Sequence, residues 1–438
     1  MVRKYLSISF FLILITFFAA SVEQPATITI KNTVDMRNGP GSYYKLLLRL
    51  SPDTEVEQLD QKYQWLKIKT DQQTGWIPER ASYLGEPESE RSPDQGEVVS
   101  NSEDAFAELA DDQTDSTDSN QASRAQVAAA VKGFAQTFTS QKTESQDVTL
   151  LENFNNYTDP ESYQEFRNKR LQDWSWEKAQ SRVTIKTSEA PVLNPKRERA
   201  GWGVANVIAQ QGLVKDRALQ QYLTNIALLI GENSHRFEAP VQVYILDTDK
   251  FTGYAAPNGA IFVSKAVLKL VETEAEFAFF VAHELAHIVH NHGMKETDRR
   301  QAKIRAQQRF QELDSEIDGG NKKYESTEQE LNQMANEMYR YAIKDRLKQY
   351  EYSADFWGLA YVYRAGYDPH GGENLVQRIY NKQGDFQQKI GKATWKGTSL
   401  RKRFAKIKNQ IDNYNLADNF GRSYPKVWER KMQGLGDE

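Results

Sequence analysis

Residues 283–287 read His-Glu-Leu-Ala-His, and these residue types at this spacing can perform hydrolytic chemistry. In a helix, four residues make just over one turn, so His283 and His287 share a face and their imidazoles can converge on one cation. Glu284 then lies about 100° around the helix, where its carboxylate can reach a metal-bound water without competing for the metal. The segment 277–289 is apolar and has no Pro or Gly, which predicts a buried helix. Because a buried carboxylate without a partner is costly, we interpret the pattern as a metal site.

A catalytic zinc site normally takes three protein ligands and leaves a fourth position for water, so two imidazoles do not complete it. His290 points the same way as His283, but it lies about 10.5 Å further along a straight helix, too far to share one cation. Glu351, in a helical stretch predicted from about 331 to 363, could supply a carboxylate ligand. Asp355, one turn later, could accept the free N–H of a ligating imidazole. From the residues alone, this pair is also typical of a solvated helix face.

The N-terminal part of the chain predicts short strands separated by turns. Residues 36–41 (MRNGPG), 65–68 (WLKI) and 74–77 (TGWI) resemble motifs of the bacterial SH3-like domain. The resemblance implies a small β-barrel over residues 25–85, with a peptide or peptidoglycan as its ligand. A spacer role is an equally open alternative.

The remaining segments differ sharply in composition. Residues 1–21 combine a basic start, a short apolar run and small residues, which predicts a secretory signal peptide, with an uncleaved anchor as the alternative. The chain has no Cys, which favours a bacterial periplasmic or secreted protein without disulfides. Residues 86–122 predict a disordered acidic linker, residues 123–199 a helical linker region, and residues 200–438 a second, larger domain. The predicted fold class is α+β.

Charge and hydropathy exclude two classes of protein. The 438 residues hold 56 Lys and Arg against 60 Asp and Glu, a formal charge of −4, which argues against a nucleic-acid partner. The mean hydropathy of −0.71 excludes a protein with several membrane spans. We therefore expect no integral span once the signal peptide is cleaved.

The larger domain resembles the HtpX/Oma/BepA-type zinc metallopeptidases, a group of HExxH gluzincins, in its soluble periplasmic branch. The likeness covers about Val204 to Gly372, and its motifs occur in the same order: residues 255–264, 274–277, 283–292, 351–355 and 365–369. It implies a mainly helical zincin-type domain with a small β-sheet and one Zn²⁺ per chain. By this likeness His283, His287 and Glu351 are the zinc ligands and Glu284 is the general base. The strand at 260–264 would pair with an extended substrate.

A C-terminal segment also resembles the family, with one departure. Ser423-Tyr424-Pro425 and Arg430 match the family's His-Pro-x4-Arg segment, with Tyr in place of His. The resemblance implies that Arg430 steadies an oxyanion and that Tyr424 donates a hydrogen bond to it. Residues 252–259 depart from the family's cleft-edge motif, so the cleft is expected to favour different side chains.

The charged insertion at 294–350 predicts a surface helix, or alternatively a lid hinged at Gly319-Gly320. His290 or His292 could occupy the open metal position in a latent state.

The expected function is a periplasmic or secreted zinc endopeptidase that cleaves polypeptides, such as misfolded or envelope proteins. A zinc-bound water would attack the peptide bond with the help of Glu284. Two alternatives stay open: an endopeptidase of peptidoglycan crosslinks, suggested by the SH3-like module, and a zinc-bound latent chaperone or scaffold.

Overall fold

The computed structural model describes residues 26–84, 158–187, 201, 204–205, 208–209, 211–293, 295, 347–387, 394–395, 398–417 and 422–435. The predicted signal peptide and acidic linker lie outside these residues, as does most of the 294–350 insertion. Among the described helices, none combines the length and hydropathy needed to cross a membrane.

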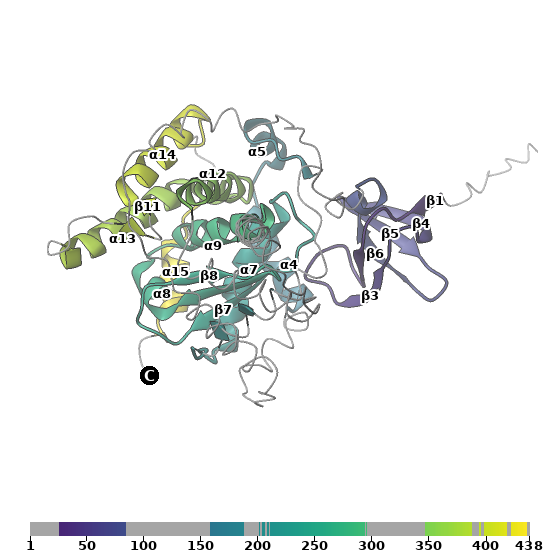
Figure 1. Cartoon of the computed structure of the whole chain (residues 1–438), viewed down its shortest axis with the longest axis horizontal. Helices are drawn as coiled ribbons and strands as arrows, with labels where there is room; N and C mark the ends of the chain where they lie inside the picture. The colour runs from purple at the N-terminus through teal and green to yellow at the C-terminus, as the bar shows by residue number, and fades with distance from the viewer. Residues whose placement is uncertain are drawn as a thin grey trace, which may run out of the picture.

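The N-terminal part is a six-stranded antiparallel sheet in the order β1-β4-β5-β6-β2-β3 (Figure 1). Its elements are β1 (Thr27–Thr29), β2 (Val34–Arg37), β3 (Leu46–Leu50), β4 (Glu55–Lys62), β5 (Trp65–Lys69), β6 (Thr74–Pro78) and the short 3-10 helix η1 (Glu79–Ser82). Met36, Ile68 and Ile77 are fully buried and form the centre of its core. Gly75 is required beside them, because a Cβ there would lie 2.6 Å from Met36 Cγ and 2.9 Å from the Arg37 carbonyl oxygen. The SH3-like part of the predicted fold is confirmed.

The larger part is mainly helical and contains a small three-stranded sheet, as predicted, and a separate two-stranded one, β10-β11. Its helices are α4 (Pro160–Leu171), α5 (Trp176–Arg182), α7 (Arg217–Glu232), α8 (Lys265–Leu270), α9 (Glu274–Val289), α12 (Lys348–Arg364), α13 (His370–Gln387), α14 (Leu400–Asn413) and α15 (Pro425–Met432). Its strands are β7 (Gln242–Leu246), β8 (Gly253–Ala255), β9 (Ala260–Ser264), β10 (Thr394–Trp395) and β11 (Thr398–Ser399). Helices α4 and α5 lie within the predicted helical linker region. Figure 1 shows α9 between the sheet and α12, and both neighbours contact it.

The three-stranded sheet has the order β7-β9-β8, so β9 is its central strand. β9 pairs with β7 in parallel register over its whole length and with β8 in antiparallel register over residues 261–263. Both edges of β9 are therefore occupied, and the expectation that residues 260–264 pair with substrate is wrong. Of the described strands, β8 is the one that borders α9 with one edge unpaired.

Helix α9 is the central helix of the domain, and all its residues are buried. Thr273 caps its start by accepting a hydrogen bond from the Glu276 N–H at 3.1 Å. Glu274, in the first turn, is fully buried and binds the Arg170 guanidinium through two hydrogen bonds of 2.6 and 2.8 Å. A helix predicted at 277–289 is thus observed at 274–289, anchored at its N-terminal end by a buried ion pair.

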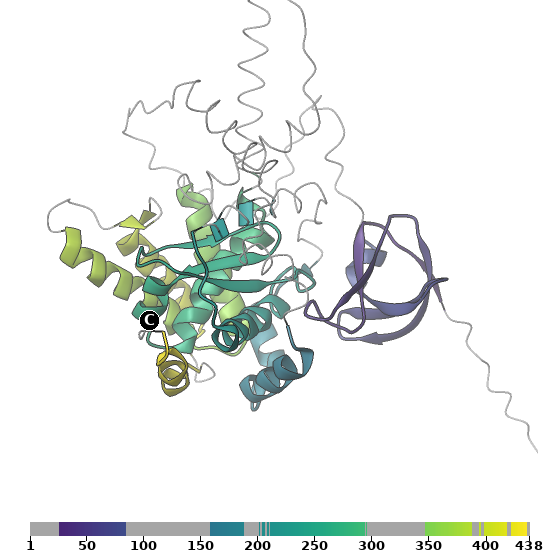
Figure 2. The ribbon, with the colours of Figure 1, turned by 90° about the horizontal axis from the view of Figure 1, so that it is seen from below.

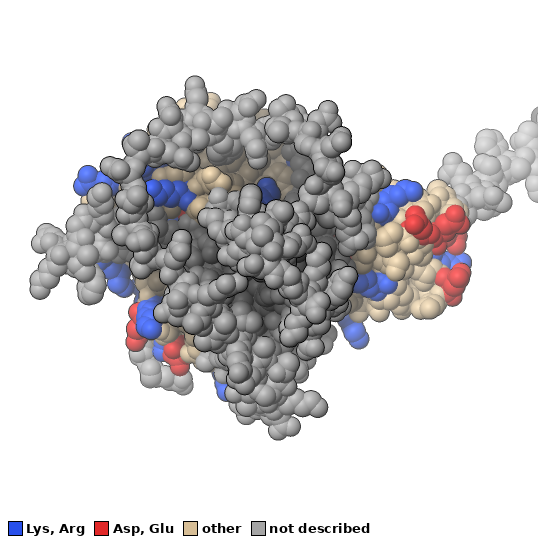
Figure 3. Space-filling model, viewed as in Figure 1, with Lys and Arg blue, Asp and Glu red and all other residues tan. Residues whose placement is uncertain are grey.

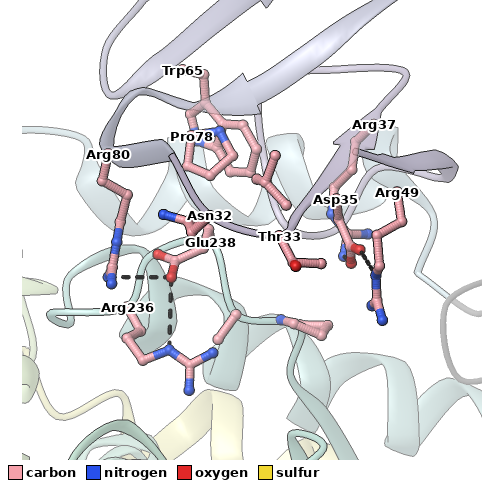
Figure 4. Close-up of a pocket in the computed structure, with 13 residues that line it drawn as sticks. Asn32, Thr33, Asp35, Arg37, Arg49, Trp65, Pro78, Arg80, Arg236 and Glu238 are labelled. Carbon is pink, nitrogen blue, oxygen red and sulfur yellow. Dashed lines mark hydrogen bonds and ion pairs between the residues drawn. The ribbon is translucent and has the colours of Figure 1, made fainter. Parts of the chain in front are cut away.

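The barrel lies beside the helical domain and contacts the connection between α7 and β7 (Figure 2). The ring of Phe237 packs edge-on against Trp65, with centroids 5.7 Å apart. Arg80 of the barrel forms a 3.3 Å ion pair with Glu238 and donates a 3.4 Å hydrogen bond to the His235 carbonyl oxygen. Figure 4 shows this junction, where residues of both parts line a cavity of about 70 Å³.

Charged side chains are unevenly placed on the barrel. On the face seen in Figure 3, acidic side chains gather at its outer end, where β1 and β4 lie, and basic ones lie mainly toward the helical domain. The junction with the helical domain is thus the basic side of the barrel in this view.

Candidate metal centre

Three side chains from two helices converge on one buried point. His283 and His287 come from α9, and Glu351 comes from the first turn of α12. His283 Nε2 lies 3.3 Å from His287 Nε2 and 3.3 Å from Glu351 Oε2. His287 Nε2 lies 3.4 Å from Glu351 Oε1. The structure therefore brings together the two histidines and the distant carboxylate that the sequence singled out.

The spacing of these atoms fits a dication. A cation that binds tetrahedral ligands at about 2.0–2.1 Å requires neighbouring ligand atoms about 3.3 Å apart, which is close to the three observed distances. His283 Nδ1 lies 2.9 Å from Asp355 Oδ1, so its proton belongs on Nδ1 and its Nε2 lone pair faces the centre. Lone pairs and a carboxylate that face one another repel unless a cation lies between them. Two nitrogens and one carboxylate oxygen are a common set of zinc ligands.

The close approach of α12 to α9 places Glu351 and Asp355. The helices cross at Gly358, where a Cβ would lie 3.0 Å from the His283 backbone nitrogen. Ala354, one turn earlier, is also buried. Small residues on this face let the backbones approach, so the side chains at 351 and 355 reach the centre from one side.

Arg403 of α14 completes the surroundings of Asp355. It is fully buried, and its Nε and Nη2 donate to the two Asp355 oxygens at 2.7 and 2.6 Å. Its Nη1 lies 3.6 Å from Glu351 Oε2. Burial raises the pKa of Asp355, but the charge of Arg403 and the His283 hydrogen bond outweigh it, so the pKa is lowered and Asp355 stays ionised.

Sequence reasoning missed Arg403, although a signal was present. The buried positions of α14 are 400, 403, 407, 410 and 411, the spacing of one helix face. An arginine on the same face as Leu400, Ile407 and Ile411 predicts a buried anionic partner.

The two remaining histidines near α9 do not join the three ligand atoms. His292 Nδ1 lies 3.1 Å from His287 Nδ1, on the opposite side of that ring from Nε2. His290 Nε2 lies 3.0 Å from the Tyr361 hydroxyl. Burial lowers the pKa of both rings well below the usual value, so both are neutral. In this structure neither His290 nor His292 lies beside the three ligand atoms, where either could have acted as a ligand in a latent state.

The Tyr361 hydroxyl connects His290 to the barrel junction. It lies 2.8 Å from Nδ1 of His235, whose backbone carbonyl accepts the hydrogen bond from Arg80. The rings of His235 and His290 also contact each other, with centroids 5.0 Å apart.

Comparison with known proteins agrees with this geometry. Residues 214–430 match the model of Peptidase family M48, and residues 31–81 match that of the bacterial SH3 domain. The chain carries an M48 peptidase domain. All three converging residues, Glu284 and Arg403 lie within the match, and the resemblance to a metallopeptidase family is confirmed.

Curated relatives of the M48 domain share a short region with this chain. The "Beta-barrel assembly-enhancing protease" of Yersinia pestis is 26% identical over 110 residues, which is 25% of this chain and 23% of that protein. The protein of the same name from Escherichia coli (strain K12) is 21% identical over 80 residues, 18% of this chain and 16% of the relative. The chain thus spans less than a quarter of the curated relatives it matches.

The C-terminal segment of the M48 domain lies at the other end of α9. Tyr424 packs against Arg170, whose guanidinium lies 4.4 Å from the ring centroid, and Arg170 binds Glu274. Glu274 precedes His283 by nine residues, about 13.5 Å along the helix. Arg430 is exposed in the last turn of α15. The structure therefore does not bring Tyr424 or Arg430 to the candidate metal centre, because α15 packs against the N-terminal half of α9.

Proposed function

We propose that the M48 domain is a zinc-dependent endopeptidase in which His283, His287 and Glu351 hold the metal. The observation that carries this proposal is the convergence of two imidazole nitrogens and a carboxylate at 3.3–3.4 Å in a fully buried position. Glu284, the general base of the proposal, follows His283 directly and is also fully buried.

The chemistry divides between the metal and the side chains around it. When bound, Zn²⁺ would polarise a water molecule and the carbonyl group of the scissile peptide. Glu284 accepts a proton from the attacking water and delivers it to the leaving amine. Asp355 holds the proton of His283 on Nδ1, and Arg403 keeps Asp355 ionised.

The substrate binds as an extended chain along β8. Central β9 has both edges paired, whereas β8 borders α9 and has one edge unpaired among the described strands. An extended peptide that adds to this edge gains backbone hydrogen bonds with little dependence on sequence. Gly253 keeps the strand close to α9, because a Cβ there would lie 2.3 Å from Phe280 Cζ.

The physiological substrates in this proposal are misfolded or envelope proteins of a bacterial periplasm. Two observations support it: the signal-peptide composition of residues 1–21, and relatives named for enhancing β-barrel assembly. The bacterial SH3 domain favours a second candidate, cleavage of peptide crosslinks in the cell wall. Zymography with purified peptidoglycan, run beside digestion of unfolded casein, separates the two.

The assignment of Glu284 is tested by Glu284→Gln, with Glu177→Gln on the exposed face of α5 as the control. We expect Glu284→Gln to bind zinc as the parent does, because it removes no ligand, and to cleave casein about 10²–10⁴-fold more slowly. Metal content and initial rate are measured on the same preparation. A Glu284→Gln protein that cleaves at the parental rate rules out the assigned base. The control is expected to keep full activity.

A further inference from the structure

His292 lies against the side of His287 that faces away from the candidate metal centre. Helix α9 ends at Val289, and Asn291 then adopts a left-handed backbone conformation with φ of 53°. Asn tolerates this conformation better than most residues. The turn brings His292 back onto the last turn of α9, where its side chain is 3% exposed and its Nδ1 lies 3.1 Å from His287 Nδ1.

Two ring nitrogens at this distance share one proton, and its position decides what His287 can do. If His292 donates, the proton of neutral His287 lies on Nε2, where it occupies the lone pair that faces Glu351. If His287 donates, its Nε2 lone pair is free to bind a cation. Only the second arrangement is compatible with His287 as a ligand, and it requires an acceptor at the position of His292 Nδ1.

The ring of His292 is held where it can accept this hydrogen bond. It stacks on Tyr350, with centroids 4.7 Å apart and planes inclined by 19°. Tyr350 directly precedes Glu351 on α12, so one helix supplies the third ligand and a wall of the His292 site. His290 lies near the ring as well, with centroids 5.8 Å apart and planes inclined by 23°.

We propose that His292 is a positioning residue: its Nδ1 accepts a hydrogen bond from His287 Nδ1 and thereby fixes the tautomer whose Nε2 binds the metal. The inference rests on the proposed function, because His287 needs a fixed tautomer only if the centre binds a metal. Each ligating imidazole then has its own acceptor, the Asp355 carboxylate behind His283 and a neutral imidazole behind His287.

Three substitutions separate hydrogen bonding from packing. His292→Asn keeps an acceptor close to the position of Nδ1, whereas His292→Leu has nearly the size of Asn and no acceptor. His292→Phe keeps a ring to stack on Tyr350 and also lacks the acceptor.

Zinc affinity is measured on the full chain, stripped of metal, by competition with a chromophoric chelator. We expect Leu and Phe to weaken zinc binding about 10–100-fold and Asn to bind within a few-fold of the parent. Visible absorption of the Co²⁺-loaded proteins should show parental coordination in the Asn variant.

The outcomes distinguish this inference from the proposed function. If the parent binds zinc and the Leu or Phe variant binds it equally tightly, the positioning role is wrong and the metal centre stands. If Asn binds zinc as weakly as Phe, an acceptor at this position does not restore binding and the inference is overturned. A parent that binds no zinc overturns the proposed function, and this inference with it. Circular dichroism in the presence of chelator checks that each variant is folded. If the Leu variant does not fold, the Phe variant, which also lacks the acceptor, is compared with Asn instead.

Discussion

At the scale of single residues, the candidate centre depends on a buried carboxylate that is not itself a proposed ligand. Asp355 accepts from His283 on one side and from Arg403 on the other. Arg403 is fully buried and also lies near Glu351. The two carboxylates therefore share one internal cation, which offsets the cost of burying them together.

Removal of that cation is expected to destabilise the protein strongly. Arg403→Met leaves Asp355 and Glu351 buried without it, so we expect the free energy of unfolding to fall by about 3–5 kcal/mol. The control is Arg401→Met on the exposed side of α14, where the guanidinium donates to the Tyr380 hydroxyl and the expected loss is below about 1 kcal/mol. Urea denaturation in the presence of chelator measures both. Equal stability of the two variants would contradict the role given to Arg403.

Much of the site could be predicted from local spacing, and the rest could not. His283 and His287 lie a turn apart on any helix, so their convergence follows from the sequence alone. Glu351 reaches them only because α12 crosses α9, which is tertiary information, and residue types alone left it open. Arg403 was missed because an arginine in a helix is most often solvated, although its position on an apolar face was visible.

At the scale of elements, the contact between α9 and α12 decides whether the ligand set exists. At Gly358 the two backbones approach so closely that a Cβ would lie 3.0 Å from the His283 backbone nitrogen. The role of Gly358 is invisible in the sequence, where a Gly within a helix signals mainly a loss of helix propensity. The order of the strands was equally hidden. The continuous apolar run at 260–263 predicts a strand buried on both faces but does not say which strand of the sheet has an open edge.

Adding a methyl group at Gly358 tests whether the close approach of α12 to α9 is needed to place Glu351. In Gly358→Ala the Cβ meets the His283 backbone, which cannot yield as a side-chain end can, so α12 must move outward. We expect a loss of about 1–3 kcal/mol in stability and weaker zinc binding, because Glu351 moves with α12.

The control is Gly231→Ala in α7, where the Cβ would meet only Val241 Cγ2 at 3.6 Å and a gain of about 0.4–1 kcal/mol in stability is expected. Denaturation in chelator and zinc competition measure the two effects. If Gly358→Ala matches Gly231→Ala in stability and zinc affinity, the contact between α9 and α12 tolerates a Cβ and the close approach is not required.

At the scale of the whole molecule, the SH3 barrel and the M48 domain share buried polar groups. Arg80 of the barrel is 3% exposed and pairs with Glu238, which also lies 3.7 Å from Arg236. Figure 4 shows these charges gathered at one end of the junction cavity. The α+β class and the two-part order were predictable from composition and motifs. The junction was not, because neither surface has a sequence pattern of its own.

The junction is expected to contribute measurably to stability. Arg80→Met removes the barrel's cation from Glu238 and a donor from the His235 carbonyl, so we expect a loss of about 1–3 kcal/mol. The control is Lys69→Met, since Lys69 pairs with Glu57 on the barrel away from the junction cavity and is 57% exposed, and a loss below about 1 kcal/mol is expected there. Thermal unfolding followed by tryptophan fluorescence compares them. An Arg80→Met protein as stable as Lys69→Met would contradict the contribution given to the junction.

The connection between α7 and β7 has a practical consequence for work on fragments. Phe237 and Glu238 face the barrel, while His235, two residues earlier, contacts Tyr361 and His290 beside the proposed zinc ligands. A fragment without the barrel would expose Phe237 and the Glu238 carboxylate to solvent. The connection between α7 and β7, which holds His235 against His290, would then be less well supported. A change in the turnover of such a fragment could therefore have two causes. One is solvent exposure of this loop, and the other is the loss of the barrel as a recognition module. Point variants at the junction are the cleaner way to ask what the barrel recognises.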